Sequence, residues 1–462
     1  MLLAVIAGGL LVVILTAVAL LMLVPAMTRR AIRTVLTRPM SDTLAELFVS
    51  LKSTPAIDFL YSSLRSQTGE VIIRPMGSAR PVHGLDDLAL VPAQLHRSPL
   101  PFDAPVDLSV TIGPSRPRPL HSQLPIYLSG MAYGLAVTKN ARLALARASG
   151  AAGIPLNSGQ GPFLDEERRL SHTYVLQYGR WTWNRDPEVL RQADMLEVQV
   201  GQGAMPGNAV VATPGELAPE IQRMLDLKPG EPPIIHARLF LREPSEPESL
   251  ERVVEHLRHI ASDVPIAVKM GAGQALERDL DVALSAGVDL IVIDGTEGAT
   301  GNAPITLSDH FGIPSLMALV RAQRHLQARG RRDAVQLAIS GGFREPGDIV
   351  KALCLGADMV GLATIAMFAL AHAQITEAVP LYPPTDLVFY RSHPQIPLDV
   401  DRAARSLTNF LESTRKEMEL ALRTMGHASL GDLSPADLCA LDPTVAAYAG
   451  VPYAGASPGS GG

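Results

Sequence analysis

From about residue 125 onward, short apolar runs alternate with longer amphipathic stretches, and this rhythm limits the possible folds more than any other feature of the chain. The runs have the composition of buried parallel strands. They are Ile126–Met131, Ile154–Asn157, Thr173–Tyr178, Leu196–Val200, Pro265–Met270, Leu290–Ile293, Val335–Ile339 and Met359–Ala363. The helical stretches between them are Val137–Ala148, Glu251–Ile260, Leu276–Ala286, Leu316–Ala328 and Pro346–Leu355. Eight strand-like runs, most of them separated by helical stretches, predict an α/β fold of the (β/α)₈ TIM-barrel type. An open doubly wound sheet is the alternative, but no G-x-G-x-x-G turn follows the first run.

The composition excludes several classes of protein. Hydrophobic residues make up 47% and charged residues 19% of the 462 residues, which excludes a disordered or collagen-like chain. The net charge is −6, and the only basic cluster lies near residue 30, so we expect no nucleic-acid partner. Two cysteines, Cys354 and Cys439, are too few for a disulfide framework or a complete iron–sulfur ligand set. No metal site is therefore predicted.

The first 28 residues carry no charged side chain, and this length would suffice for a bilayer span of about 20 apolar residues. Arg29, Arg30, Arg33 and Arg38 follow the apolar stretch. Basic residues after the stretch, rather than before it, favour an uncleaved anchor with the rest of the chain in the cytoplasm. We therefore expect a single-pass protein of the cell membrane. The alternative is a buried core helix.

Five segments are predicted in chain order. A transmembrane anchor spans residues 1–28, and a helical or irregular N-terminal cap spans 29–124. The barrel spans 125–375, a C-terminal helical extension spans 376–453, and a disordered Gly/Ser-rich tail spans 454–462. The long amphipathic helix expected over Ala403–Leu422 belongs to the extension, whose role the sequence leaves open.

The catalytic and binding residues of a barrel lie at the carboxyl ends of its strands, and in this sequence glycines are frequent at those positions. Gly341-Gly342 and Gly361 to Thr364 follow the seventh and eighth runs, where barrels commonly bind phosphate. A single glycine more often only ends a strand, but the set indicates a phosphorylated ligand. Lys269 ends the fifth run, and a lysine buried there needs an anionic or electron-rich partner. Such a cation would stabilise a reduced flavin; alternatively, it forms a structural ion pair with Asp294 or Glu297.

Taken in chain order, these motifs resemble the FMN-binding domain of glutamate synthase over about Pro125 to Ala371. The matching stretches are Gly130-Met131-Ala132-Tyr133-Gly134, Asn157-Ser158-Gly159, Gly179-Arg180, Gln202-Gly203-Ala204 with Pro206-Gly207, Val268-Lys269, Asp294-Gly295 with Gly298 and Thr300-Gly301, and Gly341-Gly342. The DGTEGATGNAP stretch at 294–304 is most similar to the stand-alone, membrane-anchored members of the family.

The resemblance implies FMN at the barrel mouth and reduction of 2-iminoglutarate to glutamate by hydride from the flavin. The cofactor-binding residues that it implies are Gly130, Met131, Ala132, Asn157, Lys269, Gly295, Gly341, Gly342, Gly361 and Thr364, with the phosphate at the last four. Among the catalytic residues that it implies, Lys269 would stabilise reduced FMN, and Arg180 and Gln202 would orient the substrate. Glu297 is a candidate acid or base; alternatively, it is a solvated loop carboxylate.

The chain also departs from the family pattern. Residues 368–380 contain no cysteine, so we expect no [3Fe–4S] cluster, and the glutaminase domain is absent from this sequence. Met205 replaces a substrate-facing lysine, and Gln160 replaces a glutamate. Loss of that lysine removes a partner for a dicarboxylate, so a substrate less acidic or larger than 2-oxoglutarate is an alternative. Arg180 could still donate two parallel hydrogen bonds to one substrate carboxylate.

Three functions remain open on the sequence. The first is a glutamate synthase-type oxidoreductase with a small-molecule substrate, whose electron donor could be NAD(P)H, ferredoxin or a membrane carrier. The second is a flavin barrel of the hydroxy-acid oxidase type, which needs a histidine base such as His236 or His310. The third is a repurposed, non-catalytic flavoprotein subunit.

Overall fold

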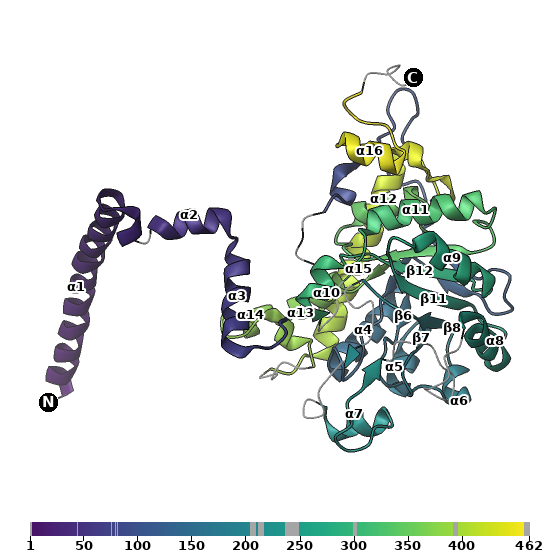
Figure 1. The fold of residues 1–462 in the computed structure, drawn as a ribbon. Coiled ribbons are helices and arrows are strands. Elements are labelled where there is room, and N and C mark those ends of the chain that lie inside the picture. The colour runs from purple at the N-terminus through teal and green to yellow at the C-terminus, as the bar shows by residue number, and fades with distance from the viewer. Residues whose placement is uncertain are drawn as a thin grey trace. The chain divides into compact units, whose positions relative to one another are not determined.

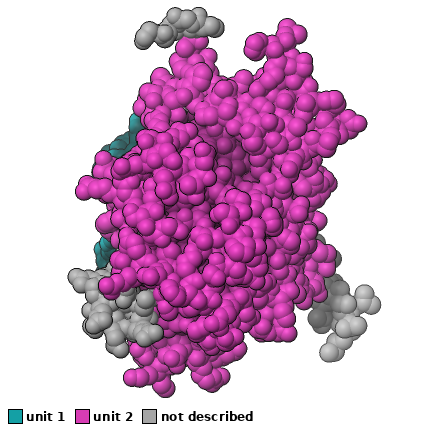
Figure 2. All heavy atoms as spheres, turned by 90° about the vertical axis from the view of Figure 1, so that its right-hand side faces the viewer, with its two compact units in different colours: residues 1–72 teal, residues 73–462 magenta. Residues whose placement is uncertain are grey.

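The structure, a computed structural model, describes residues 2–43, 45–74, 76–78, 80, 82–203, 209–210, 217–235, 249–298, 303–390 and 396–456. The chain divides into two compact units, residues 1–72 and 73–462, which Figure 2 shows in teal and magenta. Each unit is described by itself. The five predicted segment boundaries remain a prediction.

The first unit is helical. It contains α1 (Leu2–Thr37), the 3₁₀ turn η1 (Met40–Asp42), α2 (Ala45–Ser53) and α3 (Ala56–Thr68). Gly69 ends α3 in the left-handed conformation (φ 69°), and its N–H donates to the Arg65 carbonyl. This is the usual way in which a glycine satisfies a free carbonyl at a helix end.

The predicted membrane anchor requires a correction. The residues that the structure describes include no helix that is both long and apolar enough to cross a membrane. The predicted location, a single-pass protein of the cell membrane with a cytoplasmic body, is wrong on this finding.

The second unit is built around a closed barrel of eight parallel strands (Figure 1). The strands are β5 (Ile126–Leu128), β6 (Pro155–Asn157), β7 (Thr173–Gly179), β8 (Met195–Gln199), β11 (Ile266–Gly271), β12 (Leu290–Asp294), β14 (Gln336–Ser340) and β15 (Met359–Leu362). Pairing of β15 with β5, which aligns Val360 with Ile126, closes the ring. The predicted barrel is therefore confirmed, with a strand at each of the eight predicted runs, and the open sheet is excluded.

Side chains alternate between the two sides of each barrel strand. On β8, Leu196 and Val198 pack in the large apolar cluster shared with the helices, whereas Met195 packs in a separate cluster with side chains of other barrel strands. The helices around the barrel are α4 (Lys139–Ala152), α5 (Asp165–Leu170), α6 (Pro187–Leu190), α7 (Pro219–Met224), α8 (Leu250–Ile260), α9 (Leu276–Ser285), α10 (Ile305–His310), α11 (Ser315–Ala328), α12 (Pro346–Cys354) and α13 (Thr364–His372). The five predicted helices correspond to α4, α8, α9, α11 and α12.

Short strands precede the barrel and interrupt it: β1 (Ile73–Arg74), β2 (Leu88–Leu90), β3 (Val110–Ile112), β4 (Leu120–Ser122), β9 (Ala209–Val210), β10 (Ile234–Ile235) and β13 (Ala303–Pro304), with the turn η2 (Leu85–Asp87). After the barrel come α14 (Ile375–Ala378), η4 (Pro384–Leu387), α15 (Val400–Met425), η5 (Leu430–Asp432), η6 (Pro435–Asp437), β16 (Leu438–Ala440) and α16 (Pro443–Ala449). The long helix α15, which covers the predicted 403–422, packs against α4 and α13. Disorder predicted from Ala454 onward falls mainly on 457–462, outside the described residues; the Ala454 N–H donates to the Ala440 carbonyl.

Candidate active site at the barrel mouth

A cavity of about 500 Å³ opens at the carboxyl ends of the barrel strands. Its lining comes from the ends of β5, β11, β12, β14 and β15 and from the segments that follow them. The predicted residues that line it are Gly130, Gln202, Lys269, Glu297, Gly341, Gly342, Gly361 and Thr364. A volume of this size is typical of sites for small molecules and cofactors.

Lys269 supplies a buried cation to this cavity. Its side chain is 5% exposed, and its Nζ lies 3.6 Å from Oδ2 of Asp294, whose side chain is 7% exposed. Asp294 also accepts hydrogen bonds from Ser340 Oγ (2.6 Å) and from the Gly203 N–H (3.2 Å). Ammonium–carboxylate hydrogen bonds are normally about 2.7–2.9 Å long, so the Lys269–Asp294 pair is a loose one. The predicted ion pair with Asp294 thus exists, and the same ammonium faces the cavity.

Glu297 also lines the cavity, but its carboxylate is engaged at the start of α11. Oε2 accepts the Ser315 N–H at 2.8 Å and the Ser315 hydroxyl at 2.8 Å. A carboxylate at this position satisfies a free N–H and interacts favourably with the helix dipole. Burial is the largest influence on Glu297 and raises its pKa, while the hydrogen bonds with Ser315 act in the opposite direction. Glu297 is therefore no freely solvated loop carboxylate.

The residues predicted to bind phosphate form two parts of the cavity wall: the Gly341-Gly342 turn and the start of α13. Gly341 and Gly342 follow β14 with φ values of +108° and +82°, a region that side chains rarely adopt. Helix α13 begins at Thr364, directly after β15, and its N-cap residue Ala363 makes no side-chain capping bond. Ala363, Thr364 and Ile365 all line the cavity, so this helix start contributes backbone groups to the same wall.

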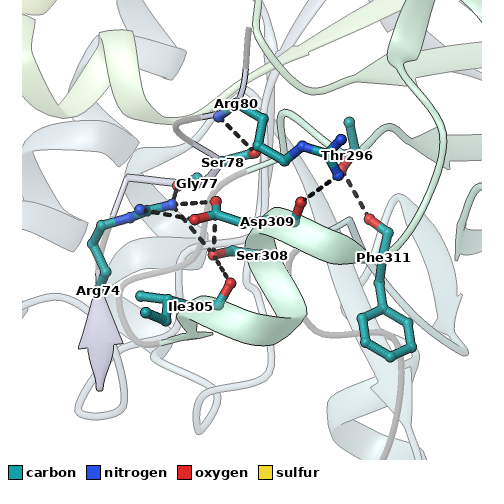
Figure 3. A network of polar contacts seen from close by, with 9 residues as sticks. All are labelled: Arg74, Gly77, Ser78, Arg80, Thr296, Ile305, Ser308, Asp309 and Phe311. Atoms are coloured by element: carbon teal, nitrogen blue, oxygen red, sulfur yellow. Dashed lines mark hydrogen bonds and ion pairs between the residues drawn. The ribbon is translucent and has the colours of Figure 1, made fainter. Parts of the chain in front are cut away.

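A segment that precedes the barrel also lines the cavity. We call residues 73–86 the strap; seven of its described residues line the cavity, namely Met76, Ser78, Arg80, Val82, Gly84, Leu85 and Asp86. Figure 3 shows how one end of the strap is fastened: Arg74 donates to both carboxylate oxygens of Asp309 on α10, at 3.1 and 2.5 Å. Arg80 Nη1 donates to the Asp309 carbonyl at 2.9 Å. The other end is fastened on α12, where Lys351 Nζ donates to the Leu85 carbonyl at 2.9 Å.

Five predicted site residues do not line the cavity: Arg180, Met131, Ala132, Asn157 and Gly295. Arg180 is 7% exposed, and burial lowers its pKa. The Asn157 amide is directed inward, where it donates to Glu197 and accepts the Gly159 N–H. The catalytic and cofactor-binding roles assigned to these residues, and to those that line the cavity, remain predictions.

Two sets of buried polar residues escaped the sequence reasoning. Arg142 on α4 is fully buried and pairs with Glu167; it also donates to the carbonyls of Met131 (2.8 Å) and Asn157 (3.0 Å). Glu197 and Gln177 lie inside the barrel, within runs interpreted only as apolar strands. The period-two placement of Met195, Glu197 and Gln199 on β8 was the signal that could have revealed an inward-facing polar layer.

Some residues of interest remain outside the description. Met205, His236 and residues 299–302 are not among the described residues. Gln160 is described; its carbonyl accepts the Trp183 indole N–H at 2.7 Å. His310 ends α10 as an exposed residue and does not line the cavity, so it offers no histidine base there.

Comparison with known families decides which barrel this is. The family model described as the conserved region in glutamate synthase matches residues 89–428, which include all eight barrel strands. The chain belongs to the glutamate synthase family. The prediction of a glutamate synthase-type barrel is thereby confirmed.

Named relatives agree with the family match. The glutamate synthase large subunit-like protein of Rhizobium meliloti (strain 1021) is 34% identical over 435 residues, covering 89% of this chain and 97% of the relative. The archaeal-type NADPH glutamate synthase of Thermotoga maritima is 28% identical and is matched over 66% of this chain. The alignment covers 64% of that relative's length, so the chain matches only part of the archaeal-type proteins.

Among solved structures, a flavocytochrome b2 mutant with bound pyruvate superposes with a TM-score of 0.49 at 18% identity, covering 79% of this chain and 78% of that one. A mandelate oxidase mutant with an FMN adduct gives 0.46 at 17% identity, covering 76% and 87%. At this distance the likeness says nothing about the chemistry of this chain.

Proposed function

We propose that this member of the glutamate synthase family is an FMN-dependent oxidoreductase that reduces an imino or oxo acid. One observation carries the proposal: the same cavity joins a buried ammonium, Lys269, to a wall of left-handed glycines and an uncapped helix start. A flavin mononucleotide needs both features, because its phosphate is an anion and its reduced ring carries negative charge.

The residues present fit this cofactor. At Gly342, an added Cβ would lie 3.0 Å from Glu297 Cβ, so the turn has no room for a side chain and its backbone faces the cavity directly. Arg344 also lines the cavity, and its guanidinium donates to Asp86, another lining residue, at 2.8 Å. Gly130, Lys269 and Gln202 line the cavity as well, and the flavin ring would lie beside them.

Bound FMN would supply hydride from its reduced ring to the substrate carbon. The chain's own residues would perform the remaining tasks. Gly341, Gly342 and the start of α13 would bind the phosphate, and Lys269 would stabilise negative charge on the reduced ring. Gln202 would orient the substrate, while the strap and the 294–298 loop would exclude water.

The substrate of the proposal follows the names of the relatives, since two of them are called NADPH glutamate synthases. We propose the iminoglutarate–glutamate pair as the first candidate and a less acidic imino acid as the second. The second rests on Met205, which stands where the family's substrate-facing lysine is expected. NAD(P)H or ferredoxin would act as the electron donor.

The test uses the purified full-length chain. We expect a yellow protein that releases one FMN per chain on heating, identified by chromatography and mass spectrometry. Under anaerobic conditions, 2-oxoglutarate with ammonium should reoxidise the chemically reduced protein, with glutamate as the product. A colourless protein that takes up neither FMN nor its reduced form would refute the cofactor assignment. A flavoprotein that reacts with none of a panel of imino acids would refute the reaction while leaving the cofactor intact.

A further inference from the structure

The carboxylate of Glu197 lies inside the barrel beneath the mouth. It is 1% exposed on β8, on the strand face that Met195 shares with the barrel interior. The helix-facing residues Leu196 and Val198 flank it on the other side of the strand. Acidic side chains are almost never fully buried without partners, so the position calls for an explanation.

The contacts of Glu197 are amide donors. Asn157 Nδ2 donates to its Oε1 at 2.9 Å, and Gln177 Nε2 donates to the same oxygen at 2.7 Å. In the part of the chain that the structure describes, no lysine or arginine lies within ion-pair distance of Glu197. The two amides stabilise the carboxylate, but they leave its charge uncompensated.

The two amides that bind Glu197 lie beside Gly130, which lines the cavity. A Cβ added at Gly130, which lines the cavity, would lie 3.0 Å from Asn157 Oδ1 and 3.0 Å from Gln177 Nε2. Both amides that bind Glu197 therefore pack against Gly130, a residue of the cavity wall. Lys269 faces Asp294 at 3.6 Å, so this ammonium already has a carboxylate partner other than Glu197.

We infer that Glu197 biases the flavin of the proposed function toward its oxidised form. The inference rests on that proposed function, because it requires FMN in the cavity. A flavin gains negative charge on reduction, and a fixed anion within a few ångströms of the cavity wall disfavours that gain, whereas Lys269 favours it. Glu197 thus limits the stabilisation that Lys269 gives, and the two residues together set how readily the bound flavin accepts electrons.

The experiment removes the charge and keeps the shape. In Glu197→Gln, the side-chain oxygen still accepts from Asn157 and Gln177. We expect reduced FMN to gain about tenfold in affinity relative to oxidised FMN, which raises the two-electron midpoint potential by about 30 mV. Glu417→Gln removes an exposed carboxylate of α15 and is the matched control, with no change expected. Potentials are measured on the full-length holoprotein by titration against a reference dye, and thermal midpoints are measured alongside.

The outcomes are separable. A potential of Glu197→Gln that equals or falls below the wild-type value overturns the inference, even if stability changes. If the variant does not retain flavin, its apoprotein is titrated with oxidised and with reduced FMN, and the ratio of the two dissociation constants is compared with that of wild-type apoprotein. A ratio unchanged from wild type also overturns it. If wild-type protein itself binds no FMN, it is the proposed function that fails.

Discussion

Removal of the Arg142 guanidinium should destabilise the barrel far more than the loss of a surface ion pair. Arg142 is 0% exposed and its partner Glu167 is 2% exposed. The same guanidinium donates to the Met131 and Asn157 carbonyls, so it joins α4, α5, the segment that follows β5 and the last residue of β6. In Arg142→Met, one carboxylate and two carbonyls lose their donor inside the protein.

The magnitude follows from these contacts. Breaking a buried ion pair by removing one partner costs about 3–5 kcal/mol, because the remaining charge stays buried. In a large domain, about 2 °C of thermal midpoint corresponds to 1 kcal/mol, which predicts a fall of about 6–10 °C. The double variant Arg142→Met/Glu167→Leu removes both charges and leaves only the two carbonyls unsatisfied. It should therefore be more stable than the single variant, because no unpaired carboxylate remains, and less stable than wild type, because each unsatisfied carbonyl costs about 1–3 kcal/mol.

Differential scanning calorimetry and urea titration of the full-length chain measure both variants. Arg169→Met, which removes an exposed i,i+4 pair with Asp165, is the control and should change stability by less than about 1 kcal/mol. The reasoning is refuted if Arg142→Met lies as close to wild type as this control does. It is also refuted if the double variant is no more stable than the single one, since an unpaired carboxylate would then not be the cause.

Three further predictions concern the cavity. Lys269→Met leaves Asp294 without its cation and should lower the midpoint potential of bound FMN; an unchanged potential would contradict the role given to this ammonium. Gly342→Ala adds a Cβ close to Glu297 at a residue whose φ is +82°, so we expect FMN binding to weaken at least tenfold in a fluorescence titration. The control Gly347→Ala adds a Cβ that has no atom within 4 Å, so we expect no change in FMN binding. Burial raises the Glu297 pKa above its usual 4.5, so the folded state binds the Glu297 proton more tightly than the unfolded state does. The free energy of unfolding of wild type, relative to that of Glu297→Gln, should therefore be greatest below pH 4.5 and fall as pH rises through the raised pKa. A difference that grows with pH would contradict this prediction.

The barrel was predictable because its signal is local. A buried parallel strand is a short apolar run, and a covering helix has its own period, so eight runs such as Leu290–Ile293 located the eight strands without any tertiary information. The glycine turns at 341–342 were equally visible, because a left-handed backbone restricts the residue type.

The remaining parts depend on contacts between distant segments. Glu197 lies in a run that is otherwise apolar, and only the position of Asn157 and Gln177 on neighbouring strands explains its burial. Arg180 follows β7 as predicted yet does not line the cavity, because strand position alone does not fix where a long side chain goes. The apolar content of residues 1–28 suggested a bilayer span, but no helix among the described residues is both long and apolar enough to cross a membrane.

The fastening of the strap imposes an order on biosynthesis. Arg74 and Asp309 are 235 positions apart in the sequence, and Leu85 and Lys351 are 266 positions apart. During translation, the strap therefore leaves the ribosome long before either of its anchors exists. Until α10 and α12 have been made and packed, the strap has neither of these anchors, so its part of the cavity wall is completed only after most of the chain has been synthesised.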